Sequence, residues 1–459
     1  MAERLCLEAL KPYPEYRLAE GGWLGEIPSH WGVRRTKYVV REIDERSKSG
    51  KEQLLRVSQY TGVTQRRREN GLDEPDTRAD SLLGYKRVQT NDLVINIMLA
   101  WNGSMGVSKY EGIASPAYCV YRFRSGSLPW YFHHLLRSPA YKARIKSVSR
   151  GVVESRLRLY SDDLYRLEAM IPPPEEQLAI VRFLGWVNGR FERTINTKRK
   201  VIALLKEQQQ AIIHRAVTRS RDPSVPLIPS GIPWLGHIPR HWNVSRIKDE
   251  FHCLNTKRVP LNATERGAMT SRIYDYYGAS GVIDKVDDYL FDDELLLIAE
   301  DGANLVLRNL PLAIIARGKF WVNNHAHILK PKRGNIIYLA HLLETLSYAP
   351  WISGAAQPKL TKDRLLSISI AVAPPDEQDA IVRHVEEKTR PLRIVIVRLE
   401  HEIELFREYR ARFVADVVTG RLDVRAVAAQ LPEKVALDAG HDSAREDGDI
   451  EPTDEEVAV

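Results

Sequence analysis

Cysteine is scarce in this chain and occurs only at Cys6, Cys119 and Cys253. These positions are far apart, so they can form neither a disulfide framework nor a CxxC zinc motif. No apolar run reaches the roughly 18 residues that suggest a membrane span. The N-terminus, interrupted by Glu3 and Arg4, lacks the apolar core of a signal peptide. We therefore expect a cytoplasmic protein with no membrane partner.

The chain has 459 residues, 44% hydrophobic and 28% charged, which is enough for two or three domains with cores of their own. Its net charge of +7 is uneven, because residues 433–459 carry −8 and the rest carries +15. A basic body favours a polyanionic partner, although an ordinary soluble basic protein fits the charge as well. Residues 426–459 are predicted to form an acidic, disordered tail.

Two phrases of the sequence occur twice. Residues 23–31, WLGEIPSHW, recur as WLGHIPRHW at 234–242, an offset of 211. Residues 173–182, PPEEQLAIVR, recur as PPDEQDAIVR at 374–383, an offset of 201. A repeat of about 200 residues is too long for a solenoid unit and indicates duplicated domains. Because the tryptophans are repeated, they favour packing at a domain–helix junction: Trp23, Trp31, Trp234 and Trp242.

Each half has a variable block followed by a matched block. The variable blocks, about 32–171 and 243–373, read as mixed α/β, with short buried strands near 92–99 and 294–299. The matched blocks are helical, with a heptad seam that alternates steps of four and three. The first seam runs through Ile180, Leu184, Val187, Phe191, Thr194, Lys198, Val201, Leu205, Gln208 and Ile212. The second runs through Ile381, Val385, Lys388, Leu392, Val395, Leu399, Glu402, Phe406, Tyr409 and Phe413.

Both helical blocks are interrupted at equivalent places, by Gly189 and by Pro391. We therefore expect a short helix, a break and a long helix in each copy, the first long helix running from about 191 to 218. Equal length and register favour pairing of the two long helices. Two amphipathic helices that each lie on their own domain remain the alternative.

The repeated phrases, together with the helix endings LLKEQQQAIIHRAVTR (204–219) and FREYRARFVADVVTGRLDVR (406–425), resemble the specificity subunits of type I restriction–modification systems. The resemblance implies an α+β fold in which two α/β target recognition domains are separated by two long antiparallel conserved helices, with pseudo-two-fold symmetry. It divides the chain into these parts: recognition domain 1 (1–171, with a conserved segment at 12–31), central helical region (172–226), recognition domain 2 (227–373), C-terminal helical region (374–425) and tail (426–459).

The same resemblance implies a non-catalytic function. Each recognition domain would read one half of a bipartite site in double-stranded DNA, and the helices would set the unread gap. Two methyltransferase subunits and further restriction subunits would be the partners. No cofactor is expected in this chain, because S-adenosylmethionine would belong to the methyltransferase and ATP and Mg to the restriction subunit.

Several basic, polar and aromatic residues are candidates for DNA contact. Arginine binds guanine edges and phosphates equally well, and lysine binds phosphates. Arg66, Arg67 and Arg68 form a basic run in a polar stretch, for which a solvated loop is the plain alternative. The others lie in phrases that resemble recognition-domain phrases of the family: Lys109, Tyr277, Lys319, Asn324, His325 and Lys359.

Rival functions lack their motifs. An adenine methyltransferase would carry an Asn-Pro-Pro-aromatic motif and a glycine-rich cofactor loop. The sequence contains neither. Asp293, Glu300 and Asp301 lack the following lysine of a nuclease site. The spacing of His325 and His327 suits a metal on one strand face, but a third ligand is not evident, so we predict no metal. A helical scaffold that binds DNA without restriction partners remains the alternative function.

Overall fold

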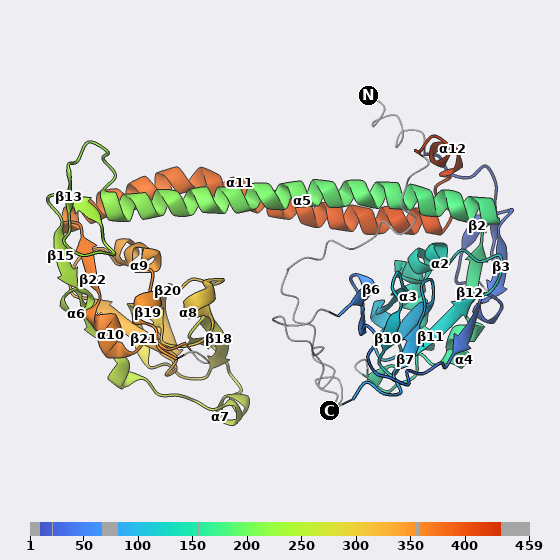
Figure 1. Cartoon of the computed structure of the whole chain (residues 1–459), viewed down its shortest axis with the longest axis horizontal. Coiled ribbons are helices and arrows are strands. Elements are labelled where there is room, and N and C mark those ends of the chain that lie inside the picture. The colour runs from blue at the N-terminus through green and yellow to red at the C-terminus, as the bar shows by residue number, and fades with distance from the viewer. Residues whose placement is uncertain (1–9, 21, 67–80, 154–155, 355–357, 433–459) are drawn as a thin grey trace. The chain divides into compact units, whose positions relative to one another are not determined.

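The computed structural model describes residues 10–20, 22–66, 81–153, 156–354 and 358–432 (Figure 1). The chain divides into two compact units. Unit 1 comprises Met1–Arg199 and His401–Val459, and unit 2 comprises Lys200–Glu400. Both divisions fall inside the long helices, so each unit contains part of both. The two units are described separately below.

Unit 1 contains short strands, a four-stranded sheet and small helices. Its sheet has the strand order β4-β11-β8-β9. Its elements are β1 (Tyr16–Leu18), β2 (Glu26–Pro28), β3 (Gly32–Arg35), η1 (Thr36–Tyr38), β4 (Val40–Ile43), β5 (Leu55–Ser58), β6 (Gly62–Gln65), β7 (Lys86–Val88), β8 (Leu93–Asn96), η3 (Ala100–Asn102), β9 (Met105–Val107), β10 (Gly112–Ala114), β11 (Tyr118–Phe123), α2 (Pro129–Leu136), α3 (Pro139–Val148), α4 (Ser161–Arg166), β12 (Glu168–Ile171) and α12 (Arg425–Ala428).

Unit 2 is built on a larger, six-stranded sheet with the order β16-β21-β19-β20-β17-β18. Its elements are β13 (Leu227–Pro229), β14 (His237–Pro239), β15 (Asn243–Arg246), α6 (Ile247–Glu250), β16 (Phe251–Cys253), η5 (Asn255–Lys257), α7 (Ala263–Gly267), β17 (Tyr274–Gly278), β18 (Gly281–Val286), β19 (Phe291–Ala299), α8 (Asn304–Leu307), β20 (Ala313–Val322), β21 (Ala326–Pro331), α9 (Ile336–Thr345), η6 (Ala349–Trp351), α10 (Lys362–Ser367) and β22 (Ser369–Val372).

A matched frame encloses the sheet of each unit. The β1–β2 hairpin has its counterpart in β13–β14, and the β3–β12 pair has its counterpart in β15–β22. Helix α4 corresponds to α10. These pairs keep the sequence offsets of 211 before the sheet and 201 after it. The duplication therefore holds in three dimensions for the frame, while the enclosed sheets differ in strand number and order.

The predicted buried strands are present within these sheets. Strand β8 is buried along its whole length, and β19 is buried over its second half, Leu295–Ala299. A run buried on both faces is what a continuous apolar segment predicts. In unit 2, residues of β19 and β21 pack against α9, which lies beside the sheet (Figure 1).

The helix breaks predicted at Gly189 and Pro391 are wrong. Helix α5 is continuous over Pro174–Arg219, and α11 is continuous over Pro375–Val418 with Pro391 inside it. Glycine in a helix interior costs only about 1 kcal/mol, and proline about 3 kcal/mol. Both helices carry buried side chains before and after these positions. The packing of these buried side chains offsets the free-energy cost of the glycine and the proline, so both helices continue through them.

From Thr194 in α5 and Lys388 in α11 onward, the predicted seam is one residue out of register at alternate positions, whereas Val187 is buried as predicted. Three residues of the predicted seam in α5 are exposed, namely Thr194, Val201 and Gln208. The residues that follow the first two of them, Ile195 and Ile202, are buried instead. The inward-facing stripes are Leu184, Asn188, Phe191, Ile195, Lys198, Ile202 and Leu205 in α5, and Val385, Thr389, Leu392, Ile396, Leu399, Ile403 and Phe406 in α11. Every pair keeps the offset of 201. The first turns of α5 face the unit 1 core, and an extra step of four then resets the heptad.

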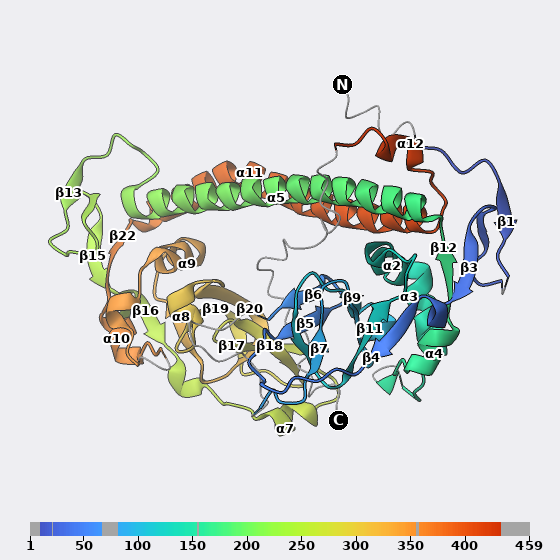
Figure 2. The same ribbon diagram turned by 45° about the vertical axis from the view of Figure 1, so that its right-hand side comes forward.

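Within unit 1 the two helices pair in antiparallel directions. Phe183 of α5 contacts Phe413 of α11, with ring centroids 5.9 Å apart, and Lys198 Nζ lies 2.6 Å from Glu402 Oε2. Residue numbers therefore rise along one helix as they fall along the other. Helix α2 lies next to this pair (Figure 2), and its Tyr131 hydroxyl donates to the carbonyl of Val418.

The start of the predicted tail is ordered, contrary to the predicted boundary at 426. Helix α12 begins at Arg425, and Val427, Ala428 and Leu431 are buried in the unit 1 core. The Asp423 amide donates to the carbonyl of Lys11 at 2.8 Å, which ties this segment to the start of the described chain. These residues are apolar, and the acidic composition begins only at 433. Residues 433–459 lie outside the described part of the chain.

Candidate nucleic-acid interface

The two repeated phrases of unit 1 meet at one buried carboxylate. Trp31 Nε1 donates to Glu176 Oε1 at 2.9 Å, and His30 Nε2 lies 2.8 Å from Glu176 Oε2. The Tyr13 hydroxyl donates to the same carboxylate. Glu176 lies in the first turn of α5, where a negative charge is favoured by the helix dipole. The phrases are therefore a junction between domain and helix.

Unit 2 repeats this junction around Glu377. Trp242 Nε1 donates to Glu377 Oε2 at 3.0 Å, His241 Nε2 lies 2.7 Å from the same oxygen, and Ser220 Oγ donates to Oε1 at 2.5 Å. Burial raises the pKa of this carboxyl, but the three hydrogen bonds outweigh burial and lower the pKa of Glu377. The third donor differs, because Ser220 follows α5 whereas Tyr13 belongs to the N-terminal segment.

The glutamine that follows each glutamate fixes the neighbouring helix. Gln177 Oε1 accepts from the amide of Leu128, just before α2, at 2.8 Å. Gln378 Oε1 accepts from the amide of Asn335, just before α9, also at 2.8 Å. Each glutamine also donates to the backbone carbonyl of the residue two positions before the start of its own helix. The repeated sequence thus encodes the same joint twice.

The first tryptophan of each repeated phrase contacts the strand that precedes the long helix. Trp23 Nε1 donates to Glu168 Oε2 on β12 at 2.7 Å, and Trp234 Nε1 donates to the carbonyl of Ser369 on β22 at 3.4 Å. The prediction that the repeated tryptophans pack at the domain–helix junction is confirmed for Trp31 and Trp242, which bind the first turn of a long helix, whereas Trp23 and Trp234 contact the strands before the helices.

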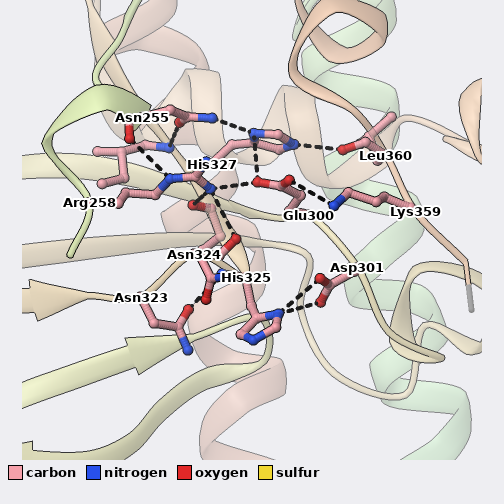
Figure 3. A network of polar contacts seen from close by, with 12 residues as sticks. Asn255, Arg258, Glu300, Asp301, Asn323, Asn324, His325, His327, Lys359 and Leu360 are labelled. Atoms are coloured by element: carbon pink, nitrogen blue, oxygen red, sulfur yellow. Dashed lines mark hydrogen bonds and ion pairs between the residues drawn. The ribbon is translucent and has the colours of Figure 1, made fainter. Parts of the chain in front are cut away.

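In unit 2, four separate phrases of the variable block converge on the turn between β20 and β21. The Glu300 amide donates to the carbonyl of His325, and the Asn323 amide donates to the carbonyl of Tyr277. The Leu360 amide donates to the carbonyl of Glu300 at 2.8 Å. These backbone bonds bring residues 277, 300, 323–325 and 360 together. Figure 3 shows Glu300, His325 and Leu360 within this region.

A polar network fills the centre of this region. Arg258 Nη1 and Glu300 Oε2 lie 2.5 Å apart, and Lys359 Nζ lies 3.4 Å from Glu300 Oε1. Beside it, His325 Nδ1 lies 2.8 Å from Asp301 Oδ2 (Figure 3). The pKa of Glu300 is lowered, because hydrogen bonding from Arg258 and nearby positive charge outweigh the effect of burial.

His327 is fully buried and its tautomer follows from its partners. Its Nε2 lies 2.7 Å from the carbonyl of Leu360, which can only accept, so Nε2 carries a proton. Asn255 Oδ1 accepts from the Ile328 amide, which leaves Asn255 Nδ2 to donate to His327 Nδ1 at 2.8 Å. Burial lowers the pKa of His327, in agreement with this neutral form. His327 therefore anchors residue 360 and does not face a ligand.

The predicted site residues of unit 2 fall into two groups. Asn324, His325 and Lys359 are exposed around the β20–β21 turn. Tyr277 lies beside them, but its ring packs edge-on against Phe320 of the core at 5.6 Å. Lys319 belongs to another part of β20, where its Nζ lies 4.6 Å above the Tyr289 ring. The structure thus brings three exposed candidates together and places Lys319 in a separate aromatic contact.

The predicted residues of unit 1 are only partly described. Arg66 follows β6, and its amide donates to the carbonyl of Leu54 at 2.9 Å. Lys109 follows β9, where its carbonyl accepts from Thr90 Oγ1 at 3.4 Å. Arg67 and Arg68 lie outside the described residues. Sequence reasoning also missed Arg258 and Asn255, because each lies in a polar stretch whose partners are remote in sequence.

The described part of the chain meets the requirements neither of a metal site of three or more ligands nor of a membrane-spanning helix. Within it, no group of three or more His, Cys, Asp or Glu residues has a geometry able to hold a metal ion. His325 and His327 have different environments, one exposed and one buried. Within the same residues, no helix is both long and apolar enough to cross a membrane.

Comparisons with known proteins agree with this architecture. A family model for the type I restriction modification DNA specificity domain matches residues 239–404. A Haemophilus influenzae protein whose name classes it as a type I restriction enzyme specificity subunit is 36% identical over 138 residues, which are 30% of this chain and 34% of that protein. The match thus spans only about a third of that relative. The MjaX specificity subunit of Methanocaldococcus jannaschii is 22% identical over 405 residues, 79% of this chain and 88% of the relative.

A solved structure shows the same fold. It comes from work on complex assembly and conformational transition of the type I R-M system, has a TM-score of 0.52 and 15% identity, and covers 85% of this chain and 98% of its own. The chain thus shares the fold of that solved structure, with two sheet-containing units and two long helices. It is similar to type I restriction–modification specificity subunits, and residues 239–404 match the family model of the type I DNA specificity domain.

Proposed function

We propose that this chain is the DNA-recognition subunit of a type I restriction–modification complex, in which it binds a bipartite site and assembles the catalytic subunits. One observation carries this proposal: two matched frames enclose two different sheets. A frame that is repeated to the level of single hydrogen bonds serves a function common to both units. Sheets that differ in strand number and order present different surfaces, as the reading of two different half-sites requires.

The matched parts are suited to binding the same partner twice. Both junctions build the same tryptophan and histidine contacts around Glu176 and Glu377. We infer that two copies of a methyltransferase subunit bind the repeated frame and helices, and that restriction subunits join them. S-adenosylmethionine, ATP and Mg would then be held by those partners, and the complex would act on cytoplasmic DNA.

In unit 2 the proposed DNA contacts are the exposed residues of the β20–β21 turn and its neighbour Lys359. Asn324 and His325 can contact base edges, and Lys359 is placed to meet a phosphate. Tyr277 supports this turn through its carbonyl, and Lys319 is a second contact on β20. In unit 1 the proposed contacts are Lys109 and the basic run that begins at Arg66 and includes Arg67 and Arg68.

The test is reconstitution of adenine methylation. The purified chain alone, incubated with labelled S-adenosylmethionine and unmodified DNA, is expected to transfer no methyl group. With the methyltransferase subunit of a type I system added, methylation is expected at one bipartite motif, read out by sequencing of the modified bases. Robust transfer by the isolated chain, or methylation by the complex with no sequence preference, contradicts the proposal.

A further inference from the structure

We propose that Glu300 is a specificity-determining positioning residue of unit 2, which holds Arg258 inward and leaves Lys359 as the cation that a DNA phosphate takes up. The inference deepens the proposed function and rests on it. It starts from the fact that two cations share one carboxylate but are held very differently (Figure 3).

Arg258 is bound to the protein through its Nη1 and Nε atoms. Besides Glu300, its Nη1 donates to the carbonyls of Asn324 at 3.1 Å and Ala326 at 2.9 Å, and its Nε donates to the carbonyl of Asn255 at 3.1 Å. Its side chain is only 16% exposed. Arg258 therefore holds the β20–β21 turn through two backbone carbonyls. These bonds fix the backbone position of Asn324 and of its neighbour His325.

Lys359 is held loosely by comparison. Its backbone is fixed, because its amide and carbonyl both pair with Ser353, at 2.8 and 2.9 Å. Its side chain is 51% exposed, and the Nζ lies 3.4 Å from Glu300 Oε1. The root of the side chain is thus positioned by the protein while the ammonium group is accessible from solvent.

Glu300 keeps a charged partner when Lys359 is released. A half-buried carboxylate left without a partner is strongly destabilising. Here Arg258 remains bound to Oε2 when the ammonium of Lys359 turns toward a phosphate, so Glu300 keeps a charged partner. The negative charge of Glu300 also offsets the two cations before DNA arrives. That weakens the attraction to phosphates of any sequence, which is the sequence-independent part of DNA binding.

The experiment measures the DNA affinity of variants of the reconstituted methyltransferase complex over a series of salt concentrations. Two duplexes are used, one that contains the motif that the complex methylates and one in which that motif is scrambled. For Lys359→Met we expect the slope of log affinity against log salt to fall by about 0.9, the value for one phosphate contact. Lys359→Arg should restore the slope, because the charge is retained.

The specificity claim is tested with Glu300→Gln against a matched control. Glu294→Gln removes the same charge from strand β19, which ends one residue before Glu300, and there Glu294 forms an exposed pair with Arg317. Glu300→Gln should raise affinity for the scrambled duplex and lower the preference for the motif about tenfold. Glu294→Gln should leave that preference unchanged. Unfolding temperatures near that of the unchanged chain show that each variant is folded.

Two results would overturn the inference: a salt slope unchanged in Lys359→Met, or a loss of preference no larger in Glu300→Gln than in Glu294→Gln. Failure of the proposed function is distinguishable, because in that case the unchanged complex already binds both duplexes equally.

Discussion

The two units agree at their junctions and differ in their sheets. At the junctions, a glutamate in the first turn of each long helix binds the histidine and tryptophan of the repeated phrase, and the next glutamine binds the amide that precedes α2 or α9. Between those fixed points, unit 1 folds a four-stranded sheet and unit 2 a six-stranded one. The comparison teaches that attachment to the long helices requires the same side-chain contacts in both units. The sheet enclosed between those contacts can differ from one unit to the other.

The junctions also differ in one informative respect, the exposure of the central carboxylate. The side chain of Glu176 is 4% exposed and that of Glu377 is 18% exposed. Glu176→Ala should lower the free energy of unfolding by about 4 kcal/mol, because the donors of Tyr13 and Trp31 lose their acceptor in a dry site. Glu377→Ala should lower it by about 2 kcal/mol, because water reaches that site. Denaturant unfolding of both variants provides the measurement, and equal losses would break the comparison.

The shared seam offers a second test, with matched residues in both helices. Ile195→Ala and Ile396→Ala remove buried side chains at equivalent positions and should each lower the free energy of unfolding by about 3 kcal/mol. Thr194→Ala and Val395→Ala change exposed neighbours and should stay within about 0.5 kcal/mol. If Thr194→Ala is as harmful as Ile195→Ala, the seam follows the register predicted from sequence and not the observed one.

A smaller effect distinguishes unit 2. Because burial lowers the pKa of His327, the folded protein keeps this side chain neutral while the unfolded chain takes up a proton as the pH falls below about 6.5. Stability should therefore fall with pH below 6.5, by at most about 1.4 kcal/mol per pH unit from this group. His327→Gln retains a donor and an acceptor without titrating, so its unfolding temperature should depend less on pH between 7 and 5. An unchanged pH dependence would show that His327 is protonated in the fold.

The repeats predicted much of this molecule, because a repeated residue reports a repeated contact. Trp31 and Trp242 were placed at the domain–helix junction from sequence alone, and their bonds to Glu176 and Glu377 confirm it. The helix break at Pro391 was predicted wrongly because a local propensity was weighed without the packing that opposes it. The seam was misplaced because the first turns of α5 face the domain core and reset the heptad, a tertiary effect that no period reveals.

The candidate site could be predicted only in part. Asn324, His325 and Lys359 are predicted from phrases that the fold brings together, and their contact with DNA stays a prediction. Arg258 and Asn255 were not found, because their partners are about 40 to 70 residues away along the chain. Nothing in the local sequence showed that His327 would be buried while His325, two residues earlier, would be exposed.

The central claim is that the matched frame carries assembly and the enclosed blocks carry recognition. Exchanging residues 243–373 for the corresponding block of a related specificity subunit tests it most directly, with sequencing of the methylated bases in cells that carry the chimera. The account predicts an active chimera in which one half of the methylated motif changes and the other half is retained. A chimera that methylates an unchanged motif, or one in which both halves change together, would contradict it.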